Sequence, residues 1–219
     1  MKLPRAPHAV VFDMDGLIFD TERLYRDSMM TAAEQYGREL PLSVFISMIG
    51  GTGESTKRTL SEHFGPGFDL ETYMAQTWVH FHEMADADLV LKAGVSELLD
   101  LLDRRKMPRA IATSSTRDIV DHHLGAHDLF RRFDTVVAHG DYARGKPNPD
   151  PYLEAARRLG VAPELCLALE DSHNGVRAAS SAGMMTIMVP DLLDPTEEMQ
   201  TLCVRIAHDL HEVCELLAG

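Results

Sequence analysis

The sequence predicts an α/β protein built on a doubly wound parallel sheet, with a helical segment inserted after the first strand. Short apolar runs rich in branched residues recur along the chain and end in polar clusters, and segments with helical spacing separate most of them. Strands that alternate with helices are typical of a doubly wound sheet. One long stretch lacks strand-like runs and has helical spacing instead, so we expect the insert there.

The apolar runs predict five buried strands, at Ala9 to Phe12, Ala110 to Ala112, Thr135 to Ala138, Leu165 to Leu169 and Thr186 to Val189. Small and apolar residues three or four positions apart predict core helices at Val95 to Arg105, Asp118 to Leu124, Pro151 to Leu159 and Gly175 to Ala182. In the insert the same spacing predicts helices at Leu24 to Tyr36 and Leu70 to Met84, with a glycine turn at Gly50, Gly51 and Gly53. We therefore assign residues 1–20 and 89–219 to the α/β core and residues 21–88 to the helical insert.

Composition and charge exclude several classes of partner. A chain of 219 residues with 45% hydrophobic residues can bury one core and carry a smaller attached unit. The formal net charge of -13 argues against non-specific binding to nucleic acid or to an anionic membrane surface. The four-residue apolar run near the N-terminus is too short for a signal peptide or a membrane span. We expect a cytoplasmic protein and, because no apolar stripe demands a partner, a monomer.

The first predicted strand ends in two aspartates, Asp13 and Asp15, followed by Gly16. The carboxyl ends of parallel strands form the ligand crevice of an open sheet. Two carboxylates placed there repel each other and lose hydration, so they require a cation or a shared proton. The alternative is that one of them only caps the following helix.

A second pair of acids, Glu170 and Asp171, follows the predicted strand at Leu165 to Leu169. Magnesium prefers a few carboxylate or carbonyl oxygens and fills its remaining positions with water and substrate phosphate. Two acidic strand ends that face one crevice predict a magnesium site. Asp171 or Ser172 could instead be a helix cap.

Hydroxyl groups and one lysine complete the candidate site. The strand at Ala110 to Ala112 ends in Thr113 and Ser114, whose hydroxyl and backbone N–H groups can hold phosphate oxygens. Lys146 lies in a proline-stiffened loop that can hold its ammonium group against phosphate and carboxylate. An ordinary helix N-cap and a solvated loop lysine are the respective alternatives.

The order of these four motifs resembles that of the haloacid dehalogenase-like hydrolases. The resemblance covers essentially the whole chain and implies a Rossmann-like core with a helical cap after the first strand. It implies that Asp13 is the nucleophile and a Mg²⁺ ligand, and that Asp15 is the general acid and base with its backbone carbonyl on the metal. Thr113 and Ser114 would hold phosphate and Lys146 would neutralise charge. Glu170 and Asp171 would complete the metal site.

The segment from Phe12 to Glu22 is similar to the subgroup that contains β-phosphoglucomutases, sugar-phosphate phosphatases and pseudouridine-monophosphate phosphatase. The mutases carry a histidine and a cap-loop arginine where this chain has Tyr25 and Gly53, although Lys57 and Arg58 follow closely. The resemblance therefore favours a magnesium-dependent phosphatase that hydrolyses a small phosphorylated metabolite, a sugar phosphate or nucleoside monophosphate. The reaction would pass through an aspartyl-phosphate intermediate. A phosphomutase of the β-phosphoglucomutase type is the alternative.

Two further alternatives come from other classes of protein. A phosphate-binding protein without turnover would be expected to lack Asp13 or Asp15, and both are present. A receiver-type signalling domain would be far shorter and would have no insert. Within the insert, Trp78 and Phe81 lie at helical spacing, and we expect them to be part of its core.

Overall fold

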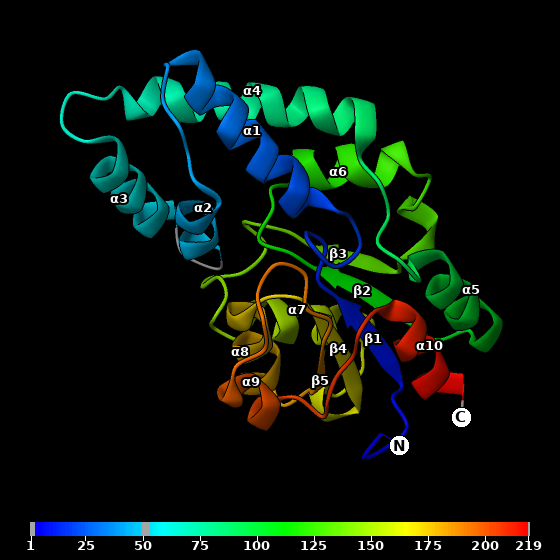
Figure 1. Cartoon of the computed structure of the whole chain (residues 1–219). Helices are drawn as coiled ribbons and strands as arrows, with labels where there is room; N and C mark the ends of the chain where they lie inside the picture. The colour runs from blue at the N-terminus through cyan, green and yellow to red at the C-terminus, as the bar shows by residue number, and fades with distance from the viewer. Residues whose placement is uncertain (1–2, 50–52, 219) are drawn as a thin grey trace. The chain divides into compact units, whose positions relative to one another are not determined.

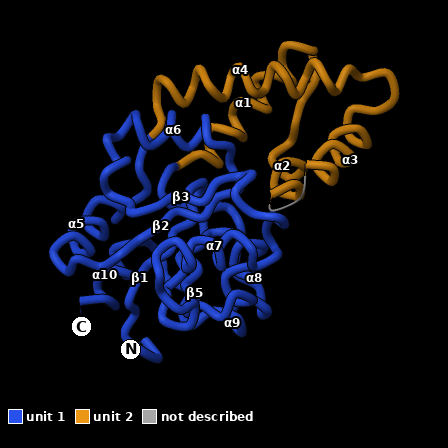
Figure 2. Tube along the Cα trace, turned by 180° about the vertical axis from the view of Figure 1, so that it is seen from behind, with its two compact units in different colours: residues 1–19, 90–219 blue, residues 20–89 orange. Residues whose placement is uncertain are grey.

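The chain forms two compact units, shown in Figure 2. The computed structural model describes residues 3–49 and 53–218. One unit contains Met1–Phe19 and Val90–Gly219, and the other contains Asp20–Leu89. The second unit leaves the first after the opening strand and its loop, so the α/β unit is assembled from both ends of the chain.

The α/β unit is built on a parallel sheet with the strand order β3-β2-β1-β4-β5-β6 (Figure 1). The opening strand lies at the centre of this order, between β2 and β4. The order reverses there, which is the switch point where an open sheet has its crevice. The predicted doubly wound parallel sheet is confirmed. The strands are β1 (Ala9–Phe12), β2 (Arg109–Ala112), β3 (Thr135–Val137), β4 (Cys166–Glu170), β5 (Met185–Met188) and β6 (Arg205–Ile206).

The sequence did not predict the edge strand β6. It has only two residues, both partly exposed, and so presents no apolar run. The helices of this unit are α5 (Val95–Arg105), α6 (Arg117–Ala126), α7 (Asp150–Leu159), α8 (His173–Ser181), α9 (Glu197–Leu202) and α10 (Leu210–Ala218). The first four overlap the predicted helices, and α9 and α10 were not predicted.

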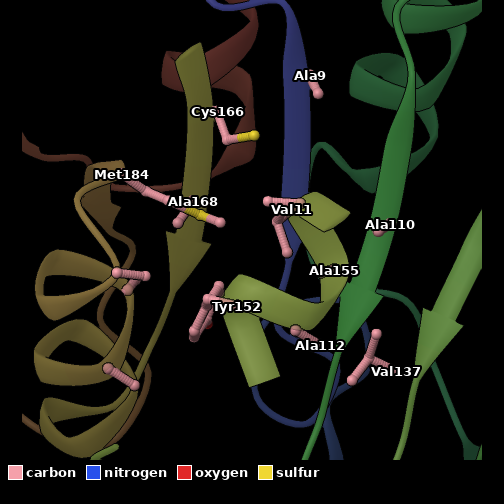
Figure 3. Packing of buried hydrophobic residues seen from close by; sticks show 14 residues of the cluster. Ala9, Val11, Ala110, Ala112, Val137, Tyr152, Ala155, Cys166, Ala168 and Met184 are labelled. Atoms are coloured by element: carbon pink, nitrogen blue, oxygen red, sulfur yellow. The ribbon is translucent and has the colours of Figure 1, made fainter. Parts of the chain in front are cut away.

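Alternating residues of the strands divide the core between two faces of the sheet. Ala9 and Val11 of β1, with Ala168 of β4, point to the face that α7 and α8 cover (Figure 3). Small residues on these helices let them pack closely, and Tyr152 of α7 is fully buried among them. The other face is covered by α5 and α10, which lie side by side (Figure 1). With both faces covered, the strands carry the continuous apolar runs seen in the sequence.

The second unit is entirely helical over its described residues, with α1 (Thr21–Gln35), α2 (Leu42–Met48), α3 (Gly53–Phe64) and α4 (Leu70–Asp88). Helices α1 and α4 pack against each other along their length, and the buried hydroxyl of Tyr73 donates to the carbonyl of Met29 at 2.9 Å. Phe81 is buried as expected, but Trp78 is 40% exposed. Trp78 lies against the Tyr25 ring with its outer face uncovered within this unit, so its assignment to the core was wrong.

Two other expectations concern the glycine turn and membrane-spanning segments. Gly50 and Gly51, predicted to form a turn, lie outside the described residues, and Gly53 is the first residue of α3. Over residues 3–49 and 53–218, the structure has no helix with the length and apolar character needed to cross a membrane.

Candidate active site

Asp13 begins the loop that follows β1 and is almost completely buried, with 6% of its surface exposed. Its backbone N–H donates to the carbonyl of Leu169 in β4 at 2.9 Å, which holds the aspartate level with the end of the neighbouring strand. The loop then closes on itself, because the N–H groups of Ile18 and Phe19 both donate to the carbonyl of Met14. Asp13 is thus held by the central strands of the sheet.

Lys146 lies between two carboxylates. Its Nζ donates to Asp13 Oδ1 and to Glu170 Oε1, the latter at 2.6 Å. The side chain is 8% exposed and its ammonium group lies 5.1 Å from the centre of the Tyr152 ring. The alternative of a solvated loop lysine is therefore wrong for this residue.

Glu170 is fully buried and all its partners are polar groups of the protein. Oε1 accepts from Lys146 and from the Tyr152 hydroxyl, the latter at 2.7 Å. Oε2 accepts from the backbone N–H groups of Asp171 and Ser172 and from the Ser172 hydroxyl, at 3.0 to 3.1 Å. A carboxylate with this many donors keeps its charge when buried, so Glu170 holds the lysine in a fixed position.

Gly175, in the first turn of α8, leaves the space that the Glu170 carboxylate occupies. A methyl group on this glycine would lie 1.6 Å from Glu170 Oε1 and 2.1 Å from Oε2. Because such contacts are impossible, a side chain at position 175 would displace the carboxylate from its donors.

We expect Gly175→Ala to lower the free energy of unfolding by about 1–3 kcal/mol, the usual result of forcing atoms into a packed interior. Urea denaturation monitored by circular dichroism measures the change. Gly53→Ala is the matched control, since a methyl group there would meet no atom within 4 Å. Equal stability of the two variants would show that Glu170 can move without cost.

Three of the predicted metal-site carboxylates form a group that could hold a cation. Oxygens of Asp13, Glu170 and Asp171 all lie within 4.8 Å of one another, and all three residues are buried. Lys146 pairs with two of the three, Asp13 and Glu170. Hard carboxylate oxygens suit Mg²⁺, so the donor set fits the predicted metal.

The pKa values of Asp13 and Glu170 shift in opposite directions, although both carboxylates bind Lys146. Burial raises the pKa of Asp13 well above its usual range, and Glu170 and Asp15 raise it further, against the opposing effect of Lys146. Burial also acts to raise the pKa of Glu170, but Lys146 and the surrounding hydrogen bonds outweigh it, and the pKa is lowered. Burial acts to lower the pKa of Lys146, yet Asp13 and Glu170 raise it overall. Lys146 and Glu170 therefore form the compensated pair, and a further cation would favour the ionised form of Asp13.

Hydroxyl groups surround the carboxylate of Asp15. Its Oδ2 accepts from the Thr113 hydroxyl at 3.2 Å and from the Ser115 hydroxyl at 2.7 Å. The fully buried ring of His123 approaches from another side, with Nδ1 4.0 Å from Asp15 Oδ1. Asp15 is thus close enough to Asp13 to raise its pKa, but its carboxylate is not one of the three that form the group. Its predicted metal contact through the backbone carbonyl stays a prediction.

The two phosphate-site candidates have different surroundings. Thr113 is fully buried, its N–H donates to the carbonyl of Val137 at 3.0 Å, and its hydroxyl is directed to Asp15. Ser114 is exposed. The structure places Thr113 next to Asp15, and the binding of phosphate by both residues stays a prediction.

Most of the helix caps proposed as alternatives are formed by other residues. The N-caps of α1 and α6 are Asp20 and Thr116, so neither the paired aspartates nor Thr113 and Ser114 serve there. Ser172 is the N-cap of α8, and its hydroxyl accepts from the N–H of Gly175 at 3.1 Å. The cap alternative is thus correct for Ser172 and wrong for Asp171.

The sequence did not identify several polar groups that support the site. Ser115 follows the two predicted phosphate-site residues, so its strand-end position was a usable signal. Tyr152 and His123 are distant in sequence from the carboxylates that they approach, and nothing in a single sequence distinguishes them from ordinary helical residues.

The central strands of a doubly wound parallel sheet thus end in buried carboxylates suited to a hard cation, and a buried lysine reaches them from the loop between β3 and α7. The chain belongs to the haloacid dehalogenase-like hydrolases, whose family model matches residues 10–189. The family predicted from the order of the motifs is therefore confirmed.

Three similar proteins illustrate the range of this family. The chain is 40% identical over 187 residues to a Drosophila melanogaster protein described as "probable pseudouridine-5'-phosphatase", covering 83% of this chain and 80% of that one. It is 32% identical over 179 residues to a phosphorylated carbohydrates phosphatase of Thermotoga maritima, covering 82% and 83%. A solved structure described as "putative beta-phosphoglucomutase" from Thermotoga maritima has a TM-score of 0.80 and 29% identity, covering 95% of this chain and 99% of that one.

Proposed function

We propose that this chain is a magnesium-dependent phosphatase that hydrolyses a small phosphomonoester, a sugar phosphate or nucleoside monophosphate, through a phosphoryl group carried on Asp13. The observation that carries the proposal is the buried pair of carboxylates, Asp13 and Asp171, at the ends of the central strands, with the buried Lys146 on Asp13 and with Asp15 nearby. The phosphatase names of the Drosophila and Thermotoga relatives support the reaction and the class of substrate.

In the first step, a carboxylate oxygen of Asp13 forms a bond to phosphorus and the ester P–O bond breaks. Lys146 reduces the repulsion between the carboxylate and the phosphate and stabilises charge on the phosphoryl oxygens. Bound Mg²⁺, held by Asp13, Asp171 and the backbone carbonyl of Asp15, would supply the remaining positive charge. Asp15 donates its proton to the leaving oxygen.

In the second step Asp15, now ionised, removes a proton from water, and the water oxygen attacks the phosphorus atom of the acyl phosphate. The P–O bond to Asp13 breaks, which releases inorganic phosphate and restores the Asp13 carboxylate. The hydroxyl groups of Thr113 and Ser115 stabilise the ionised form of Asp15 between the two steps, since both donate to its Oδ2. One carboxyl group thus serves as acid and then as base.

We further propose that residues 20–89 act as the cap that selects the leaving group. This helical unit leaves the chain directly after the loop that carries Asp13 and Asp15, and it returns at Val90. The stretch from Thr59 to Leu91 contains no lysine or arginine, which suits a substrate with a single phosphate. Monomeric state and cytoplasmic location stay predictions.

A phosphomutase is the second candidate, supported by the likeness to the structure described as a β-phosphoglucomutase. Such an enzyme must hold a second phosphate while the first is transferred. Lys57 and Arg58 are exposed on α3 and could contribute, but the positions that match the mutase histidine and arginine hold Tyr25 and Gly53. The phosphatase is therefore the better supported of the two.

The experiment that tests the proposed function is phosphate release from para-nitrophenyl phosphate and a panel of sugar and nucleoside monophosphates, including pseudouridine 5'-phosphate. We expect turnover with Mg²⁺ and a loss of at least about 10³-fold in EDTA, because removing a cation from a developing phosphoryl charge costs several kcal/mol. Turnover that is unchanged by EDTA would contradict the metal requirement. Conversion of β-glucose 1-phosphate with a bisphosphate primer, without phosphate release, would favour the mutase.

A further inference from the structure

Asp191 lies beside the carboxylate group although it belongs to a different strand end. In the sheet, Glu170 of β4 is paired with Met188 of β5, and the N–H of Val189 donates to the carbonyl of Glu170 at 2.7 Å. The chain leaving β5 therefore runs beside the chain leaving β4. Asp191 follows two residues after Val189, so it comes to the same edge of the sheet as Asp171.

Gly16 shows how close the two aspartates are. A methyl group on Gly16 would lie 2.3 Å from Asp171 Oδ2 and 3.5 Å from Asp191 Oδ2. Gly16 also has a φ of +82°, a conformation that residues with a Cβ rarely adopt. Glycine at this position lets the Asp171 carboxylate approach the loop after β1, and Asp191 Oδ2 borders the same glycine.

The two oxygens of the Asp191 carboxylate have different surroundings. Oδ1 accepts from Lys92 Nζ at 2.7 Å, and the N–H of Lys92 is itself anchored to the carbonyl of Ile18 at 2.9 Å. Oδ2 is buried and receives no hydrogen bond from any residue within 3–49 and 53–218. Buried carboxylate oxygens normally have a donor. Lys92 supplies a donor for only one of the two carboxylate oxygens of Asp191.

We infer that Asp191 is a positioning residue of the magnesium site, whose Oδ2 accepts a hydrogen bond from a water molecule on the cation. The inference rests on the proposed function. Mg²⁺ in proteins usually keeps several of its waters, and each water has protons that require acceptors. Outer acceptors of this kind orient the directly bound groups and strengthen metal binding. Lys92 would hold the carboxylate by Oδ1, so that Oδ2 stays directed toward Asp171.

The test measures Mg²⁺ binding itself, by isothermal titration calorimetry on phosphate-free protein. We expect Asp191→Asn to weaken Mg²⁺ binding about 10-fold or more, the usual cost of removing an outer-shell partner, with an unchanged melting temperature in EDTA. Asp194→Asn is the matched control, because it removes the same charge from an exposed position in the same loop and should leave the affinity within about twofold of wild type.

Each other outcome has a defined meaning. If Asp191→Asn binds Mg²⁺ as tightly as wild type, or if both variants weaken binding equally, the inference is overturned while the proposed function stands. If wild type itself binds no Mg²⁺, the proposed function fails. Should Asp191→Asn fold poorly because Lys92 loses its partner, the double variant Lys92→Met with Asp191→Asn removes that lysine charge, and it must show the same loss of affinity.

Discussion

Asp13→Asn is expected to lower turnover on every phosphomonoester by at least about 10⁴-fold, because a neutral amide cannot replace the attacking carboxylate. The change is nearly isosteric and keeps an oxygen that can accept from Lys146. Steady-state phosphate release on the panel measures the effect. Asp121→Asn, an exposed change on α6, is the control and should retain full activity.

The same variant has a second expected property that separates loss of chemistry from loss of fold. Burial raises the pKa of Asp13 well above its usual range when no metal is bound, so ionising it at neutral pH destabilises the folded state. When folding raises the pKa of a carboxyl group, the folded state loses stability as the pH rises through that raised pKa. Without metal, we therefore expect Asp13→Asn to melt at or above the wild-type temperature at neutral pH. An inactive variant that melts well below wild type would not support the nucleophile assignment.

Asp15→Asn is expected to lower steady-state turnover by about 10²–10⁴-fold, the usual contribution of a general acid and base. The two steps should be affected differently. Para-nitrophenolate leaves readily without a proton, so with para-nitrophenyl phosphate the first step should continue. Hydrolysis of the acyl phosphate needs the base and should become very slow.

Rapid-mixing kinetics can separate these steps. Asp15→Asn should release one equivalent of para-nitrophenolate per active site in a burst and then turn over slowly, and intact-mass spectrometry should detect the phosphorylated protein. With a sugar phosphate, whose leaving group needs a proton, no burst is expected. A variant that shows equal, burst-free loss on both substrates would argue that Asp15 acts only by holding the loop in place.

Local patterns were enough to predict the strands and the chemistry at their ends. The central strand was predicted with its observed bounds, Ala9–Phe12, because a strand buried on both faces is a continuous apolar run. Asp13 directly follows β1 and Glu170 is the last residue of β4, so their common edge of the sheet could be inferred. The short edge strand β6 and helices α9 and α10 were not predicted, since short or terminal elements leave little periodic signal.

The pairing of side chains could not be predicted in this way. The sequence suggested that Glu170 and Asp171 had the same task. In the structure Glu170 is surrounded by donors and pairs with Lys146, whereas burial and repulsion raise the pKa of Asp13. These differences depend on which groups lie within hydrogen-bond distance of each carboxylate. A single sequence does not show which distant side chains come that close.

The sequence by itself determined the fold class, the family and the carboxylates at the ends of the central strands, because each depends on residues that are neighbours along the chain. Only the tertiary structure decided how those carboxylates are compensated. Lys146 reaches Asp13 across 133 residues, and Asp191 comes beside Asp171 through the pairing of β4 with β5. Burial and charge depend on distance in space, so residues far apart in the sequence determine which carboxylate is paired with Lys146 and which has its pKa raised.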